Sequence, residues 1–179
     1  YPIAFNTKIN IGKNWIKKRN FERMGFEINF SKKQYDFKIP EAIQYAKNNK
    51  KKIILLLNSS EWEWSAFKES RTNIFDNQFN TFKWLVEDFL KENKDIFLVF
   101  RFHPQFAFRD LIYKEKVNLL LDKVNPNQIY IIQPESRVNT NSLSDYSDLI
   151  LTFYTSAAPE ASLLGKKVIS IGPASFQYF

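Results

Sequence analysis

The chain has 179 residues, of which 44% are hydrophobic, and a formal net charge of +7 at pH 7. This length can bury one good core, with or without an extension. The sequence contains no cysteine and a single histidine, His103, which excludes a disulfide scaffold, a His/Cys zinc site and a Cys-His nucleophile pair. The longest apolar runs, at 53–57 and 96–100, are far too short to span a bilayer.

The positive charge is concentrated in the first 52 residues. They carry 13 Lys and Arg against 4 Asp and Glu, whereas the rest of the chain carries 13 against 15. The basic runs at 17–19 and 50–52 leave two interpretations open: a solvated surface, or a contact with nucleic acid, anionic lipid or a charged glycan. Since no RGG-type segment or RNP-like aromatic motif is present, we expect no specific nucleic-acid partner.

Residues 1–38 show no clean hydrophobic period, and we expect a basic N-terminal segment or an interdomain crossover there. From residue 39 the pattern is regular and begins with a helix that has Pro40 in its first turn. Further helices are predicted at 79–92, 109–124 and 156–164, strands at 52–57, 96–102, 128–132, 148–153 and 167–171, and a polar loop at 133–147. The residues expected on the core-facing sides of the helices include Ile43, Tyr45, Trp84, Leu111 and Ile112.

Strands that alternate with helices predict an α/β fold with a doubly wound parallel sheet and right-handed crossovers. We expect this sheet to form one domain over residues 39–179. Because the chain begins at Tyr1 and ends without a charged tail, we also expect it to be part of a longer protein.

Two of the strand ends carry candidate site residues, because ligands of open parallel sheets bind at the carboxyl edge. Ser59 and Ser60 follow the strand at 52–57, where small hydroxyl residues let backbone N–H groups approach an anion. Taken without the other sites, this segment favours the alternative of ordinary helix capping. Arg101 and His103 end the strand at 96–102. There an arginine can clamp phosphate oxygens, and an imidazole can donate to a phosphate or act as an acid or base. Alternatively, His103 satisfies a loop carbonyl and Arg101 pairs with a helix acid.

A third candidate group lies where the strand at 148–153 leads into a helix. Thr155 and Ser156 stand at the start of that helix, where unpaired N–H groups and the helix dipole suit a phosphate. Glu160 follows Ser156 by about one turn, so both are expected to face the same mouth, and a carboxylate there suits the hydroxyls of a ribose. A capped helix with an acidic first turn remains the alternative.

These motifs together resemble a known family. The Arg-x-His-Pro motif at 101–104 and the Thr-Ser-x-x-x-Glu-x-x-x-x-Gly-Lys segment at 155–166 resemble the C-terminal nucleotide-sugar domain of GT-B glycosyltransferases. The likeness is greatest to bacterial capsule and surface-polysaccharide biosynthesis proteins, including the Kdo-transferase-like and CDP-glycerol-transferase-like groups. The Asn-Ser-Ser stretch at 58–60 looks similar too, and the resemblance spans roughly residues 40–175.

The resemblance implies a Rossmann-like half of a GT-B fold and a role for each candidate residue. His103 would be catalytic and contact the donor phosphate or sugar, with Arg101 beside it. Thr155 and Ser156 would hold the phosphate, Glu160 the ribose, and Ser59 and Ser60 would line the cleft. The expected partners are a nucleotide-sugar donor and a glycan or lipid-linked acceptor; no further cofactor is implied.

Nothing resembles a DxD metal pair, so we expect no essential metal. We expect a cytoplasmic location, at the inner face of the membrane if the basic segment makes a peripheral contact with lipid. Two other functions stay open: a sugar-nucleotide 2-epimerase of the same architecture, and a non-catalytic basic module that binds an anionic polymer through residues 1–52.

Overall fold

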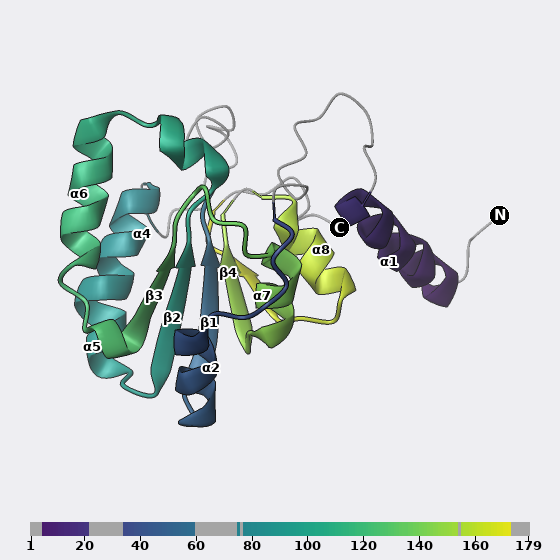
Figure 1. Ribbon diagram of the computed structural model, residues 1–179, viewed down its shortest axis with the longest axis horizontal. Helices are drawn as coiled ribbons and strands as arrows, with labels where there is room; N and C mark the ends of the chain where they lie inside the picture. Colours follow the sequence, from purple (N-terminus) through teal and green to yellow (C-terminus); the bar gives the residue numbers. More distant parts are fainter. Residues whose placement is uncertain (1–4, 22–33, 60–74, 76, 154, 173–179) are drawn as a thin grey trace.

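A five-stranded, all-parallel sheet forms the centre of the protein (Figure 1). The computed structural model describes residues 5–21, 34–59, 75, 77–153 and 155–172. The strands are β1 (Lys52–Leu57), β2 (Ile96–Arg101), β3 (Ile129–Ile132), β4 (Leu149–Thr152) and β5 (Val168–Ser170), in the order β3-β2-β1-β4-β5. The predicted α/β fold is confirmed. Because the strand order reverses between β1 and β4, the crevice at their carboxyl ends is the expected ligand position.

Helices cover both faces of the sheet (Figure 1). One face carries α4 (Gln78–Trp84), a π-helical turn (Leu85–Phe89), α5 (Leu90–Glu92) and α6 (Leu111–Leu121). The other carries α2 (Glu41–Asn48), α7 (Thr140–Tyr146) and α8 (Ala157–Leu163). Right-handed crossovers between parallel strands produce this arrangement of two helical layers.

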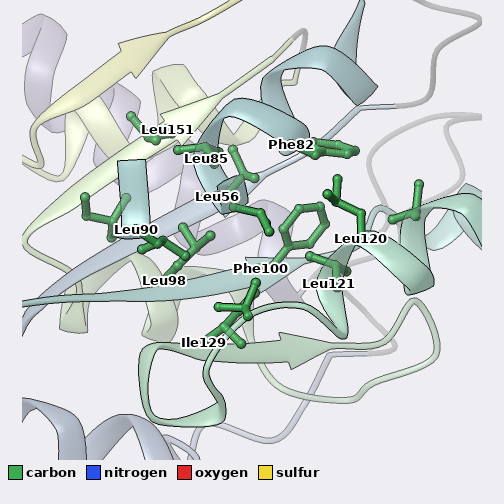
Figure 2. Packing of buried hydrophobic residues seen from close by; sticks show 14 of the residues in the cluster. Leu56, Phe82, Leu85, Leu90, Leu98, Phe100, Leu120, Leu121, Ile129 and Leu151 are labelled. Carbon is green, nitrogen blue, oxygen red and sulfur yellow. The ribbon is translucent and has the colours of Figure 1, made fainter. Parts of the chain in front are cut away.

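Alternate strand residues supply two separate cores, because successive side chains of a strand point to opposite faces. Leu56, Leu98 and Phe100 pack against Phe82 on the α4 and α6 side (Figure 2). Their neighbours in sequence pack on the other face, where Ile43 of α2 is buried. Burial on both faces explains the uninterrupted apolar run of β1.

Several helical predictions need correction. The predicted polar loop at 133–147 contains α7, whose first turn is capped by the Asn139 side chain, which accepts from the Ser142 N–H (3.0 Å). Leu111 and Ile112 are 80% and 81% exposed rather than in the core, since a short 3₁₀ turn at Pro104–Phe108 precedes α6 and sets its orientation. Tyr45 and Trp84 were also predicted to face the core, and both are exposed.

The N-terminal residues contain a helix that the sequence pattern did not indicate. Helix α1 (Phe5–Phe21) packs on α8, where a Cβ atom at Gly12 would lie 3.0 Å from Leu163 Cδ1. Further on, the Asp36 N–H donates to the Arg137 carbonyl (2.9 Å), and the Asn139 N–H donates to the Asp36 carbonyl (2.7 Å). The chain around Asp36 is thus attached to the start of α7. The division of the chain at residues 38 and 39 stays a prediction.

Candidate functional site

The candidate site lies at the carboxyl edge of the three central strands. Leu57 ends β1 and pairs with Arg101 of β2 on one side and Thr152 of β4 on the other. The chain leaves each strand at the same level, so the segments that carry Ser59, His103 and Thr155 begin side by side. This edge includes the point between β1 and β4 where the order of the sheet reverses, which is where ligands of such sheets bind.

A buried hydrogen bond joins the ends of β1 and β2. The backbone N–H of His103 donates to Oδ1 of Asn58 over 2.6 Å, and Asn58 is buried. His103 itself is extended, and Pro104 after it opens the 3₁₀ turn. Asn58 therefore fixes where the histidine lies relative to β1. Asn58 was not among the predicted site residues, because only the strand pairing shows which loop its side chain meets.

His103 is neutral at physiological pH. Burial, and secondly the charge of Arg101, lower the pKa of His103 to about 4. Its Nδ1 accepts a hydrogen bond from the Gln105 N–H (3.2 Å), so the single proton of the neutral ring is on Nε2. This arrangement suits donation of a hydrogen bond to an anion better than the capture of a proton near pH 7.

Arg101 is buried, and none of the described residues pairs with its charge. The residue is only 4% exposed, and neither terminal nitrogen has a hydrogen-bond partner within the described part of the chain. The interpretation that pairs Arg101 with a helix acid thus finds no such acid among the described residues. Burial lowers the pKa of Arg101 to about 10, which still leaves the guanidinium charged at neutral pH.

Ser59 is engaged in the interior of the protein. Its N–H donates to Oε1 of Gln78 (3.2 Å), and its carbonyl and hydroxyl oxygens accept from Nε2 of Gln78 (3.2 and 3.1 Å). Gln78 begins α4, so these bonds attach the end of β1 to the first turn of α4. A contact between Ser59 and a nucleotide-sugar donor stays a prediction. Ser60 lies outside the described residues.

Thr155, Ser156 and Glu160 lie at the start of α8, as expected. The Thr155 hydroxyl accepts from the Ala157 N–H (3.3 Å), whereas Ser156 is exposed and its side chain does not cap the helix. Glu160 is half-buried in the first turn. The helix ends at Leu163, and Gly165 after it has a φ of +80°, a conformation that glycine adopts readily beyond a helix end. The roles of these three residues toward a ligand stay predictions.

The edge therefore brings together Arg101 and His103, which interact electrostatically, at the end of the strand that neighbours β1. Among the described residues, no three acidic or histidine side chains are grouped so that they could hold a metal ion. No helix in the described part of the chain has the length and apolar character needed to cross a membrane.

Comparisons with known proteins define the fold. No family model matches the chain, and no curated protein matches it by sequence. The KpsC β-Kdo 2,4 transferase of Thermosulfurimonas dismutans is similar in structure, with a TM-score of 0.51 and 14% identity over 98% of this chain and 48% of that one. A protein of Listeria monocytogenes assigned as a UDP-N-acetylglucosamine 2-epimerase gives 0.54 and 16% over 77% of this chain and 32% of that one.

These likenesses show a GT-B-like Rossmann domain and do not by themselves specify an activity. The KpsC β-Kdo 2,7 transferase of the same organism is also similar, with a TM-score of 0.49 and 15% identity over 97% of this chain and 45% of that one. The chain spans about half the length of the two Kdo transferases that it matches.

Proposed function

We propose that this chain is the donor-binding domain of a metal-independent glycosyltransferase that transfers a sugar from a nucleotide donor in capsule or surface-polysaccharide biosynthesis. One observation carries the proposal. A neutral His103 is held at the carboxyl end of β2, at the edge where parallel sheets bind nucleotides. Beside it lies the charged Arg101, whose terminal nitrogens have no hydrogen-bond partner among the residues that the structure describes.

In this proposal the domain acts on the leaving nucleotide. When the bond between sugar and phosphate breaks, negative charge grows on the phosphate oxygens. The Nε2–H of His103 donates to that phosphate, and the guanidinium of Arg101 opposes its charge from within the fold. Because Asn58 already fixes the loop that carries His103, little reorganisation is needed when the charge develops.

The start of α8 supplies the remaining contacts. Thr155 and Ser156 bind the phosphate from the β4 side, and Glu160 binds the ribose hydroxyls. Ser59 and Ser60 line the cleft, with Ser59 acting through its bonds to Gln78. The glycan or lipid-linked acceptor binds outside this edge of the sheet. Any peripheral membrane contact is made by the basic residues 1–52.

Calorimetric titration with CMP, CDP, UDP and GDP tests the proposal. We expect one nucleotide to bind, and Glu160→Ala and His103→Gln to abolish its binding. Glu92→Ala, which removes an exposed carboxylate from α5, is the matched control and should bind normally. Nucleotide binding that is unchanged in both edge variants would contradict the proposal.

The similarity to the assigned 2-epimerase favours one alternative, a sugar-nucleotide epimerase. The full-length protein distinguishes the two: an epimerase interconverts sugar nucleotides without an acceptor, whereas a transferase releases nucleotide only when an acceptor is present. A basic binding module would instead bind an anionic polymer with an affinity that falls steeply with salt and does not depend on His103.

A further inference from the structure

Helix α6 exposes large apolar side chains on the side that faces away from the sheet. Phe108, just before the helix, and Leu111, Ile112 and Leu119 within it are 60% to 86% exposed. Single exposed apolar residues are ordinary on a protein surface, but a contiguous group of them marks an interface. Figure 1 shows α6 at the outer border of the molecule, where a second protein surface can reach it.

The exposed apolar residues lie opposite to the buried face of the same helix. With 3.6 residues per turn, Ile112 and Leu119 are two turns apart and share one side of α6. Val117, Leu120 and Leu121 are buried in the core on the other side. A surface helix of a single protein normally has one apolar side, whereas a helix that is apolar on opposite sides is covered on both. The outer side of α6 therefore calls for a cover.

Two residues of opposite charge lie between the apolar turns of this outer side. Glu115 and Lys116 are both exposed, and they follow Ile112 and precede Leu119. Lys116 lies over the ring of Phe79, with its Nζ 4.0 Å from the ring centre. Neither Glu115 nor Lys116 forms an ion pair with any residue that the structure describes. Both charges are thus available to a partner that presents one charge of each sign.

A second copy of the chain presents this pattern in the required order. Two α6 helices can pack antiparallel across a two-fold axis that passes midway between residues 115 and 116. Glu115 then meets the partner's Lys116, and Ile112 meets the partner's Leu119, because both pairs are centred on the same point of the sequence. One symmetry axis therefore satisfies the apolar residues and the charged residues together.

We propose that α6 forms the interface of a symmetric homodimer. Ile112 and Leu119 make its apolar contacts, and Glu115 and Lys116 make two ion pairs across the axis. The surface lies outside the residues assigned to the nucleotide site, so the proposal does not rest on the proposed function.

The charges of the outer side favour a second copy over an anionic bilayer. Two exposed acidic residues, Glu115 and Asp122, balance two exposed basic residues, Lys116 and Lys123. Helices that lie on a membrane have a polar face rich in lysine and arginine, and the carboxylates here would be repelled by anionic headgroups. A surface of mixed sign instead suits a partner of complementary charge pattern.

Analytical ultracentrifugation of the chain over a range of concentrations tests the proposal. We expect the wild type to form a dimer. Leu119→Asp should leave a monomer, because it puts a carboxylate into the apolar contact. Glu115→Lys and Lys116→Glu should each weaken dimerisation about tenfold, because like charges then face each other at two symmetric positions.

The two charge variants also test the antiparallel register. An equimolar mixture of the Glu115→Lys chain and the Lys116→Glu chain should dimerise as the wild type does, since one chain presents two cations and the other two carboxylates. Lys91→Glu and Glu92→Lys reverse a neighbouring pair of exposed charges on α5. They are the matched controls, and each should dimerise as the wild type does. The charge variants decide the matter if Leu119→Asp does not fold.

Several outcomes would overturn the proposal. One is a wild type that stays a monomer up to about 1 mM. Another is a monomer that binds vesicles containing phosphatidylglycerol and loses this binding in Leu119→Asp, which would assign the outer side of α6 to a bilayer. A dimer that survives Leu119→Asp, or a mixture of the charge variants that associates no better than either variant alone, overturns it as well. Nucleotide binding tests the proposed function separately.

Discussion

Asn58 and His103 are joined across two strands by a hydrogen bond of 2.6 Å from the His103 N–H to Asn58 Oδ1. Asn58 follows β1 and His103 follows β2, so one side chain fixes the relative position of two loops at the carboxyl edge. The loop after β2 brings the imidazole of His103 next to Arg101, which ends that strand. The position of the only histidine is therefore set by a contact between residues 45 positions apart in sequence.

Asn58→Ala should destabilise the protein by about 1–3 kcal/mol, because the His103 N–H would lose its acceptor inside the fold. Urea denaturation measures the free energy of unfolding. Asn49→Ala, which removes an exposed asparagine at the end of α2, is the control and should cost less. Equal losses of unfolding free energy in the two variants would show that the hydrogen bond between Asn58 and His103 stabilises the fold no more than the exposed Asn49 does.

His103 should make stability depend on pH between about 4 and 6.5. The folded-state pKa of about 4 is below the value in the unfolded chain, so the unfolded state binds a proton first as the pH falls. Stability should decrease through this window by up to roughly 3 kcal/mol and be constant with respect to His103 above it. Unfolding free energies of wild type and His103→Gln at several pH values check this. Parallel curves for the two proteins would contradict a depressed pKa.

Gln78→Ala should destabilise the protein by about 2 kcal/mol, since it leaves three buried polar atoms of Ser59 without their partner. Ser59→Ala removes only the hydroxyl and should cost about 1 kcal/mol. If Ser59 acts through α4, Ser59→Ala should also leave nucleotide affinity nearly unchanged. A large loss of affinity at unchanged stability would instead place the hydroxyl in direct contact with the donor.

Gly165→Ala should destabilise the protein by about 1 kcal/mol through backbone strain alone. Gly165 has a φ of +80°, and a Cβ added there would meet nothing within 4 Å. Gly12→Ala provides a contrast, because its Cβ would press on Leu163 and loosen the packing of α1 on α8. Thermal unfolding compares the two; an unchanged Tm for Gly165→Ala would exclude strain at this position.

The sheet and most of its strands were predictable because β1, β2 and β4 are apolar runs bounded by polar residues. Helix α7 was not, because Leu143 is its one buried apolar residue and the Asn139 cap is a local feature of a polar stretch. Periodicity identified α6 but placed Leu111 and Ile112 on the wrong side. It cannot show how the preceding turn orients the helix.

The candidate site was predictable only in part. A strand that ends in Arg-x-His-Pro could be recognised along the chain, and the parallel fold then implied the edge. The position of Arg101 in one row with Leu57 and Thr152 could not be predicted, because it depends on how β2 and β4 pair with β1. Asn58 was missed for the same reason.

The central claim is that His103 is a neutral hydrogen-bond donor to the phosphate of a nucleotide, and nitrogen NMR of its ring tests this most directly. The chain has one histidine, so the ring signals need no further assignment. We predict a ring that is neutral with its proton on Nε2 at pH 7, and a shift of the Nε2 signal with a raised pKa when nucleotide binds. A nucleotide that binds without moving these signals, or a ring in the free protein that titrates near pH 6.5, would contradict the account.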